Sequence, residues 1–580
     1  MGKTSRRRRF TADFETATWL EDETYVWCWA VSEIGNESNV EYGTKIEEFI
    51  RWCEINSDSI VYFHNLKFDG SFVLSYLLNN GYKCINDNGS KAEKTFKTLI
   101  TDMGIFFSIE IWFTTKKHIK IYDSLKLIPG KIDVMSRNFN VGLEKLDIDY
   151  NQVRDIDYIP DEHEIEYILN DVKIPAIALN SLFEKNLTKM TLASNAISDF
   201  KDGIGYRSFN HFFPILEDEI DEEIRSSYRG GFTYLNDIYK DEQVGKGLVL
   251  DVNSLYPSVL YDSRLPVGEP VFFRGKYKYD GLHDLYVQRL SCEFELKHGK
   301  IPTIQIKGDA DFKPNEYLKS SQNRVVVLTL TNIDLKLFFE NYDVKNPCYL
   351  NGFMFRSARG IFKKYIDKWT NLKIESKKNG NSSLYQISKL MLNSLYGKFG
   401  LNPRCRSKTP YLKDGIVKYK MGYVEKRKPV YIPIATFVTA YARDKTIRTS
   451  QQIKDYSIKT YGEDKYIYSD TDSIHTTLSK DELKKICDID DYRLGAWKIE
   501  NEFSRAKFIR QKTYVEEIDG KLKITCAGLP ESCYSQVTFE NFNKDLSVNG
   551  KLSYKHVKGG VKLVETTFKI KDTGLAHFRW

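Results

Sequence analysis

The sequence predicts an α+β protein built from several domains. Its 580 residues are too many for one hydrophobic core, and at roughly 150 residues per domain they suggest about three to five units. Residues 1–190 alternate strand-like and helix-like runs, 263–360 is rich in strands and turns, and 361–400 reads as two helices. Because no repeat or long low-complexity linker separates these segments, we expect the domains to pack closely.

The individual elements follow from apolar periodicity and from turn and capping residues. We expect strands at Phe10–Thr16, Tyr25–Val31, Ile60–Phe63, Ile119–Tyr122, Gly247–Val252, Tyr466–Tyr468 and Lys507–Glu517, and a helix at Asp161–Leu182. We also expect a surface segment at the acidic run Glu217–Glu223, a helix start at Asn253–Ser258, a polar loop at Lys377–Ser383 and short C-terminal strands around Gly559–Gly560.

The charge is modestly basic overall but strongly basic in one segment. The formal net charge is +7, which by itself is weak evidence for a nucleic-acid partner. Between Lys363 and Lys408, however, eleven basic residues are opposed only by Asp367 and Glu375. Such a stripe is typical of a surface that follows a phosphate backbone, although a solvated helical face is the alternative.

Cysteine, histidine and apolar patterns exclude several classes of protein. The nine cysteines and nine histidines form neither Cys-x-x-Cys nor His-x-x-x-His pairs, which argues against a disulfide framework or a structural zinc site and fits a reducing cytoplasm. No run of about 18 apolar residues is present, so we expect no membrane span.

A first set of acidic residues is spaced for a metal site. Asp13 and Glu15 are two apart in a predicted strand and point to one face. Asp69 follows, and Tyr167 and Asp171 are four apart on one helix face. Oxygen-only ligands suit Mg²⁺ or Mn²⁺, and two such ions can promote phosphodiester hydrolysis. Solvated acids are the alternative for any one of these pairs.

A second set lies where apolar strands end. Asp251 follows the apolar run Leu248–Leu250, and Asp470 and Asp472 lie at the tip of a predicted turn between two strands. A carboxylate at the end of such a strand is costly to bury without a cation. The backbone N–H groups that follow Asp251 begin a helix and can receive a triphosphate.

A lysine-bearing helix supplies a third element. Lys389, Asn393 and Tyr396 fall on one face at the helical period and suit the phosphate, base and sugar of a nucleotide. Gly397 permits close approach of a base pair to the backbone. The alternative is an amphipathic helix with a solvated lysine.

In this order, the motifs around Asp251, Lys389 and Asp472 resemble those of family B DNA polymerases, in particular the protein-primed phage polymerases of the phi-29 type. The first 190 residues resemble DEDD exonucleases of the tyrosine subtype. Further matches are Tyr122-Asp123-Ser124-Leu125-Lys126, Tyr228-Arg229-Gly230-Gly231, Lys512-Thr513-Tyr514 and Cys526-Ala527-Gly528.

The resemblance implies an RNase H-like (DEDD) exonuclease domain followed by a right-hand polymerase (palm, fingers, thumb) with two inserted terminal-protein regions. The implied boundaries are 1–190 for the exonuclease, 191–262 and 433–527 for the palm, 263–360 for the first insertion, 361–400 for the fingers, 401–432 for the second insertion and 528–580 for the thumb. The first insertion would grip the priming protein and template, and the second would close a ring around the product and help displace the downstream strand.

The resemblance also implies roles for residues of the exonuclease part. Asp13, Glu15, Asp69 and Asp171 would bind metal, Tyr167 would orient the attacking water, and Lys145 would steady the scissile phosphate. The unpaired 3′ end would be held by Thr16, His64, Asn65, Phe68, Phe72, Ser124 and Leu125.

In the polymerase part, Asp251, Asp472 and the Val252 carbonyl would bind metal, with Asp470 close by. Tyr256 would exclude the ribose 2′-OH. The incoming nucleotide would contact Ser254, Lys373, Lys389, Asn393, Tyr396 and Gly397. The DNA would contact Tyr228, Arg229, Gly230, Gly231, Lys398, Lys512 and Tyr514.

The function implied is that of a replicative DNA polymerase with 3′–5′ proofreading, protein-primed, processive and strand-displacing. It would use two Mg²⁺ ions per active site, replaceable by Mn²⁺. Its partners would be primer-template DNA, dNTPs, a terminal protein and a single-stranded DNA-binding protein, and it would act as a monomer in the cytoplasm of an infected bacterial cell. The alternatives are an exonuclease with an appended non-catalytic nucleic-acid-binding region, and a non-enzymatic replication scaffold.

Three features depart from the family pattern. Ser469 stands where the wider family usually has Gly, and Tyr385 where the nearest relatives carry Lys. The loop Lys377–Ser383 is longer than in those relatives. We expect the change at Ser469 to preserve activity.

Overall fold

The computed structural model describes residues 7–85, 89–307, 312–313 and 315–570. Its N-terminal domain is built on an eight-stranded sheet in the order β3-β2-β1-β4-β8-β7-β6-β5. The strands are β1 (Arg9–Thr16), β2 (Val26–Glu33), β3 (Asn36–Gly43), β4 (Ile60–Phe63), β5 (Lys83–Cys84), β6 (Thr95–Ile100), β7 (Phe106–Trp112) and β8 (His118–Asp123). The expected strands of this region are confirmed.

The helices that pack against this sheet are α1 (Ile46–Ile55), α2 (Leu66–Asn79) and α4 (Glu162–Phe183), and α3 (Ile132–Phe139) packs on α4. Helices α2 and α4 carry acids of the first set. The predicted helix start at Asp161 is confirmed, because the Asp161 carboxylate accepts from the Glu164 N–H at 2.9 Å and caps α4. Strand β1 pairs in parallel with β4, so Asp13 and Glu15 lie in the middle of the sheet.

A five-stranded sheet in the order β20-β11-β19-β18-β9 holds the second set of acids. Its strands are β9 (Thr233–Leu235), β11 (Gly247–Val252), β18 (Tyr466–Asp470), β19 (Ser473–Thr476) and β20 (Trp497–Phe503). The buried helix α12 (Ile432–Tyr461) packs against it, and α8 (Leu255–Asp262) follows β11. A neighbouring sheet contains β10 (Gln243–Val244), β21 (Arg505–Arg510), β22 (Thr513–Ile518) and β23 (Lys521–Cys526).

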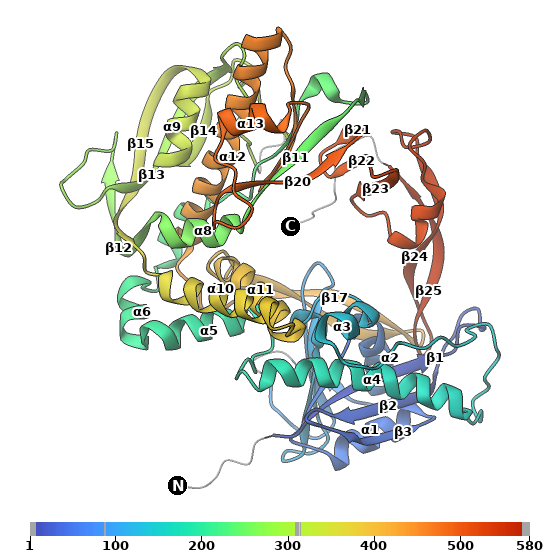
Figure 1. Ribbon diagram of the computed structural model, residues 1–580. Coiled ribbons are helices and arrows are strands. Elements are labelled where there is room, and N and C mark those ends of the chain that lie inside the picture. Colours follow the sequence, from blue (N-terminus) through green and yellow to red (C-terminus); the bar gives the residue numbers. More distant parts are fainter. Residues whose placement is uncertain (1–6, 86–88, 308–311, 314, 571–580) are drawn as a thin grey trace.

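Between these sheet strands the chain forms further units (Figure 1). The predicted β-rich segment is confirmed as the sheet β12 (Arg264–Arg274), β15 (Tyr342–Arg359), β13 (Leu285–Leu296) and β14 (Val326–Thr331), which also carries α9 (Asn332–Asn341). The two predicted helices are α10 (Lys363–Lys378) and α11 (Ser382–Phe399), and they leave only 379–381 of the expected loop outside a helix. The remaining α-helices of the described residues are α5 (Leu192–Ile204), α6 (Tyr206–Phe212), α7 (Asp218–Arg225) and α13 (Lys480–Ile486). Helix α7 shows that the acidic run is helical.

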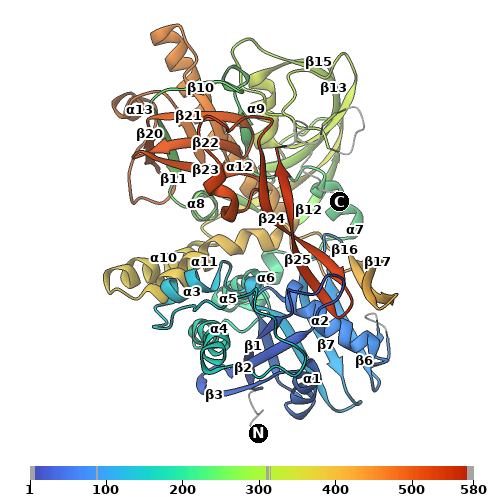
Figure 2. The same cartoon turned by 90° about the vertical axis from the view of Figure 1, so that its right-hand side faces the viewer.

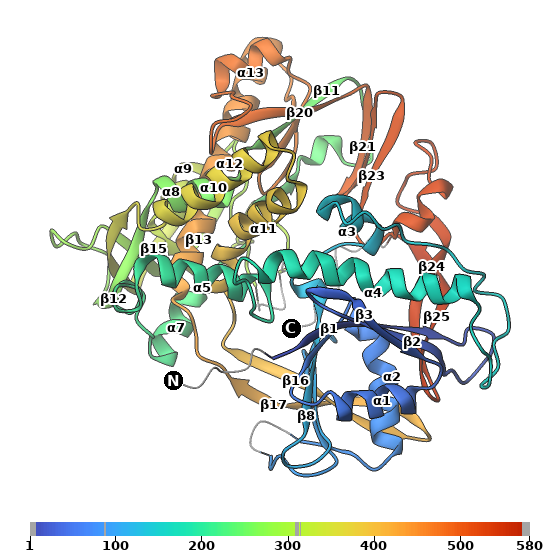
Figure 3. The same cartoon turned by 60° about the horizontal axis from the view of Figure 1, so that its bottom comes forward.

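Two long β-hairpins reach back to the N-terminal domain (Figures 2 and 3). The first pairs β16 (Arg404–Lys413) with β17 (Ile416–Lys426), and the second pairs β24 (Ser547–Val557) with β25 (Gly560–Lys569). The prediction of short C-terminal strands was wrong, since these strands have 11 and 10 residues. Their turns meet: Lys558 pairs with Ile416 and with Glu23, and the Thr24 N–H donates to the Lys558 carbonyl at 2.9 Å.

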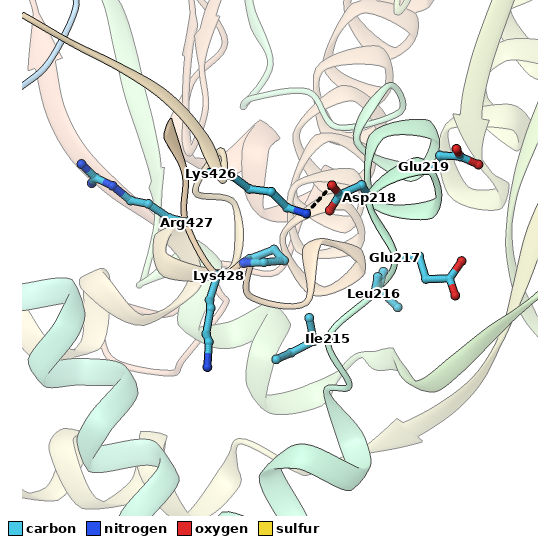
Figure 4. Close-up of a pocket in the computed structure, with 9 residues that line it drawn as sticks. Ile215, Leu216, Glu217, Asp218, Glu219, Lys426, Arg427 and Lys428 are labelled. Atoms are coloured by element: carbon cyan, nitrogen blue, oxygen red, sulfur yellow. Dashed lines mark ion pairs between the residues drawn. The ribbon is translucent and has the colours of Figure 1, made fainter. Parts of the chain in front are cut away.

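The acidic helix α7 anchors the base of the first hairpin (Figure 4). Lys426 forms an ion pair with Asp218, and Arg404 forms one with Glu222 at 2.8 Å. The opposite charges of the acidic run and of the hairpin ends therefore neutralise each other. Within the described ranges, none of the helices combines the length and apolar character needed to cross a bilayer.

The turn of the second hairpin requires glycine, and this gives a first prediction. Gly559 has φ +86°, and a Cβ there would lie 1.9 Å from the Thr24 carbonyl oxygen. We expect Gly559→Ala to lift the turn off the N-terminal domain and to speed amide hydrogen exchange at Thr24, because backbone atoms cannot move aside as a flexible side chain does.

Gly550→Ala is the matched control for that change. Gly550 lies in the same hairpin with φ +87°, so alanine there is equally strained, but its Cβ would meet nothing nearer than 4.0 Å. Equal exchange at Thr24 in both variants would contradict the docking of this turn.

Candidate active sites

The first set of acids converges at one point of the N-terminal domain. Strand β1 contributes Asp13 and Glu15, and α4 contributes Asp171; one ligand oxygen from each lies within 4.8 Å of the others. Asp69, from α2, is buried, and burial, then the charges of Asp13 and Glu15, raises its pKa. The four acids that the sequence grouped by spacing are therefore brought together.

Their electrostatics are unfavourable without a cation. Burial, and then the charge of Asp171, raises the pKa of Asp13 to about 7. Burial raises the pKa of Glu15 and Asp69 well above the ordinary range. Asp69 Oδ1 and Asp171 Oδ1 are buried and accept no hydrogen bond within the described part of the chain. Such a set of oxygen donors fits a hard divalent cation.

Two side chains that the sequence assigned to this site adjoin the acids. Lys145 Nζ donates to Asp171 Oδ2 at 2.6 Å and to the Tyr167 hydroxyl at 3.5 Å. The hydroxyls of Tyr150 and Tyr167 are 2.7 Å apart. Lys145 thus offsets part of the negative charge, and Tyr167 is held by hydrogen bonds beside the acids.

A loop at the mouth of this cluster is organised by Asp123. Its carboxylate accepts from the N–H groups of Asn65 at 3.2 Å and Leu125 at 3.1 Å. His64 Nδ1 lies 2.9 Å from the Ser124 hydroxyl. The residues of this loop that are predicted to hold the unpaired DNA 3′ end therefore support one another. Thr16, predicted for the same role, lies half-buried at the end of β1. The sequence did not indicate the role of Asp123.

The second set of acids lies on adjacent strands of the five-stranded sheet. Asp251 ends β11, and Asp472 lies in the turn between β18 and β19. The Val252 N–H donates to the Asp472 carbonyl at 2.8 Å, which couples the two segments. Burial and then the charge of Asp472 raise the pKa of Asp251 to about 6. Burial likewise raises the pKa of Asp472, so this pair also favours a cation.

Two charged neighbours modify this pair. Lys498, opposite Asp251 on β20, lies 3.3 Å from its carboxylate; no sequence motif pointed to it. Asp470 lies beside the pair, since its charge contributes to the raised pKa of Asp472. Its carboxylate accepts from Lys512 Nζ at 2.7 Å and from the Thr233 hydroxyl at 3.2 Å, so Asp470 also positions Lys512.

The lysine helix faces the same region. Lys389 and Asn393 are exposed on α11, and Gly397 is exposed one turn further. The ring of Tyr396 stacks on that of Tyr256, with centroids 4.0 Å apart. Burial, then Lys389 and Lys498, lowers the pKa of Lys373, so positive charge accumulates opposite Asp251 and Asp472. The Ser254 backbone, at φ 54°, starts α8.

Comparison with known proteins agrees with this arrangement. The profile of the family described as DNA polymerase type B, organellar and viral, matches residues 51–161 and 160–489. The DNA polymerase of Bacillus phage Nf is 44% identical over 97% of this chain and 100% of its own. The chain belongs to the type B DNA polymerases.

Solved structures extend the likeness over the whole fold. The phi29 DNA polymerase in complex with primer-template DNA and incoming nucleotides has a TM-score of 0.91 and 41% identity, over 98% of this chain and 100% of that one. The same phi29 enzyme in complex with single-stranded DNA has a TM-score of 0.88 and 40% identity, over the same shares. The fold is thus an exonuclease domain followed by palm, fingers and thumb, and the enzyme is a DNA-directed DNA polymerase that depends on divalent metal ions.

The lysines of the basic stripe have two different surroundings. Some pair with other helices, and others lie near Asp251. Lys368 forms an ion pair with Asp199 at 2.5 Å, and Lys398 Nζ donates to the Ser194 hydroxyl at 3.2 Å. These two lysines hold α10 and α11 on α5, whereas Lys373 and Lys389 remain on the side of Asp251.

The Tyr-Arg-Gly-Gly segment is fixed by an arginine that the sequence gave no reason to choose. Buried Arg443 donates to the carbonyls of Arg229 and Gly230, each at 2.8 Å, and pairs with Asp334. A Cβ on Gly231 would lie 2.5 Å from the Thr471 side chain, so the segment passes directly against the turn that carries Asp472. The Tyr228 hydroxyl lies beneath α11, where a Cβ on Gly400 would approach it to 2.8 Å.

Two residues predicted to contact DNA are largely buried. Phe72 is 1% exposed and packs against Phe68 and against the β24–β25 turn at Gly560. Tyr514 is 8% exposed and stacks on Phe508. Neighbouring rings cover both side chains, so their contact with DNA stays a prediction.

Ser469 is accommodated by a buried hydroxyl network. Its Oγ accepts from the Tyr466 hydroxyl at 2.9 Å and lies 3.0 Å from Ser450 Oγ on α12. A serine is therefore satisfied at this buried position without disturbing the adjacent Asp470. Nothing in the structure explains the tyrosine at 385.

Proposed function

We propose that this polymerase extends a primer 3′ end at Asp251 and Asp472 and hydrolyses a mispaired 3′ end at Asp13, Glu15, Asp69 and Asp171. The observation that carries the proposal is the presence of two acid clusters around two separate sheets, one buried and one half-buried, each with raised carboxylate pKa values and an adjacent lysine. We further propose that each cluster binds two Mg²⁺ ions, which Mn²⁺ can replace.

At the synthetic site the bound ions would supply charge neutralisation for attack of the primer 3′-OH on the α-phosphate. Lys389 and Lys373 bind the triphosphate of the incoming dNTP, and the N-terminal end of α8 at Ser254 receives its phosphate oxygens. The stacked rings of Tyr256 and Tyr396 lie where the sugar and base pair are received. Positioning and charge compensation suffice for this chemistry, since no protein nucleophile is required.

At the hydrolytic site water is the nucleophile. Tyr167, held by Tyr150 and Lys145, orients that water, and Lys145 steadies the scissile phosphate. Asn65, Phe68 and Leu125 hold the unpaired strand end. The phi29 structure with single-stranded DNA supports such a substrate for this chain.

The partners follow from the arrangement of the two hairpins and from the relatives. We propose primer-template DNA and dNTPs as substrates, a terminal protein as primer held by segment 263–360, and a single-stranded DNA-binding protein as an accessory. The meeting of the hairpin turns at Ile416 and Lys558 supports a monomer that encircles its product and displaces the downstream strand. The enzyme acts in the cytoplasm of an infected bacterial cell.

A sugar-discrimination experiment tests the nucleotide site. We expect Tyr256→Val to raise the incorporation of ribonucleotides relative to dNTPs by roughly tenfold or more, because the smaller side chain leaves room for a 2′-OH. The measurement is the ratio of kcat/KM for rNTP and dNTP in single-nucleotide extension. Tyr261→Val, the same exchange on the same helix, should leave the ratio unchanged. An unaltered ratio in Tyr256→Val would show that this residue does not exclude the ribose 2′-OH.

A further inference from the structure

A pocket outside both acid clusters lies where three parts of the chain meet. Helix α2 of the exonuclease domain, the hairpin β16–β17 and the thumb strand β24 enclose a cavity of about 170 Å³. Lys67, Lys408, Tyr419, Tyr554 and His556 line it. The Tyr419 ring joins the three parts, since it contacts Phe106 of the exonuclease sheet and His556 of the thumb at centroid distances of 6.2 Å and 5.6 Å.

The pocket carries positive charge without compensation. Among the described residues, no carboxylate forms an ion pair with Lys67, Lys408 or Lys418. Burial, then Lys418 and Lys67, lowers the pKa of His556. Like charges converging at a partly buried junction destabilise it unless an anion is bound.

Unused hydrogen-bonding atoms also line this junction. His556 Nδ1 is buried and has no hydrogen-bond partner within the described ranges. The Tyr419 hydroxyl is also buried, and its neighbour in the pocket is the Ser71 hydroxyl. Together with the two lysine amines they form a set of donors suited to a tetrahedral oxyanion. The cavity is large enough for one phosphate group and too small for a nucleotide base with its sugar.

The position of the pocket indicates the source of the anion. Lys67 Nζ lies 4.7 Å over the Tyr554 ring, and the Tyr554 hydroxyl accepts from Asn65 Nδ2 at 3.1 Å. The Phe68 ring is 6.4 Å from the same ring. Asn65 and Phe68 are the residues to which the proposed function assigns the unpaired strand end, so the pocket borders the path of that strand.

We propose that this pocket binds a backbone phosphate of the single strand held in the exonuclease domain, and that the bound phosphate fastens the thumb and the hairpin β16–β17 to α2. Lys67 and Lys408 contribute the charge and Tyr419 a hydroxyl donor. The identity of the strand rests on the proposed function, whereas the capacity for a phosphate rests on the pocket itself.

The test uses a double variant in which Lys67→Gln and Lys408→Gln are combined. This double variant is compared with wild type and with a charge-matched control. The control is Lys116→Gln with Lys413→Gln, which removes one exposed lysine from the β7–β8 loop of the same N-terminal domain and one from the same strand, β16. Binding of a short oligo(dT) is measured in EDTA over a series of salt concentrations. We expect the double variant to bind roughly tenfold more weakly than the control, with a salt slope smaller by about 0.7, the value for one phosphate contact on a single strand. Its melting temperature should not fall, since like charges have been removed.

A second arm uses inorganic phosphate without DNA. Phosphate, and not chloride at equal ionic strength, should slow amide exchange in 554–560 of wild type and of the control but not of the double variant. Protection by phosphate with unchanged oligo(dT) binding would overturn the DNA strand as the source. Absence of both effects, in a wild type that binds and degrades oligo(dT), would overturn the site while leaving the proposed function intact. A wild type that neither binds nor degrades oligo(dT) would instead refute the proposed function.

Discussion

Asp472→Ala is expected to abolish primer extension while single strands are still degraded from the 3′ end. Asp472, in the β18–β19 turn, adjoins the end of β11 that carries Asp251, and burial raises the pKa of both carboxyls. Removing one leaves too few oxygen ligands to hold the cations that neutralise the reacting phosphate, so we expect extension to fall by at least about a thousandfold. The measurement is single-turnover extension of a labelled primer with four dNTPs and Mg²⁺.

Asp481→Ala is the control for that variant. Asp481 lies in the same domain, and its side chain is 89% exposed, so its loss should change neither activity. Degradation of single strands by Asp472→Ala should match wild type, because the acids proposed for hydrolysis belong to the separate N-terminal domain. Equal loss of both activities in Asp472→Ala would contradict two separate sites.

The second large expected effect is loss of 3′–5′ degradation with primer extension retained. Asp13→Ala combined with Asp69→Ala should abolish 3′–5′ degradation and leave primer extension intact, because both acids belong to the exonuclease cluster and neither is near Asp251. We expect a loss of at least about a thousandfold in hydrolysis of a single-stranded substrate. The double variant Glu47→Ala with Glu93→Ala, which removes two exposed acids of the same domain, should degrade DNA like wild type.

The same double variant should also change stability, with a definite sign. The pKa of Asp13 is about 7 in the folded protein against an ordinary value near 3.8, and that of Asp69 is raised well above its usual range. A carboxyl with a raised pKa is costly to ionise in the folded state, so these acids destabilise the metal-free protein above the ordinary carboxyl pKa.

We therefore expect Asp13→Ala with Asp69→Ala to melt at a higher temperature than wild type at pH 8 in EDTA. Added Mg²⁺ should narrow the difference, because it binds and stabilises the intact cluster. A lower melting temperature of the variant in EDTA would show that the acids are stabilised by contacts other than a cation.

Local spacing was sufficient to predict much of both sites. A strand repeat of two residues places Asp13 beside Glu15, and a helical repeat of nearly four places Tyr167 above Asp171. The same reasoning placed Lys389, Asn393 and Tyr396 on one exposed face of α11. These predictions depend only on backbone geometry within a few residues, which is the same in every strand and every helix. The order of the motifs along the sequence then indicated the family.

Other features depended on contacts between distant segments. Lys498 meets Asp251 only because β20 pairs with β11, and Arg443 fixes the Arg229–Gly230 carbonyls from another part of the chain. Phe72 and Tyr514 carry the residue types of a nucleic-acid contact, yet neighbouring apolar side chains bury both rings.

The sequence by itself determined the chemistry of the two acid clusters and the fold class, because residue type and short-range periodicity decide which groups can share a face. Only the tertiary structure decided which aromatic rings reach solvent, which lysines are used in packing, and how the two hairpin turns meet on the exonuclease domain at Thr24 and Lys558. The reason is that burial and charge compensation are set by segments hundreds of residues apart, whose approach no local pattern records.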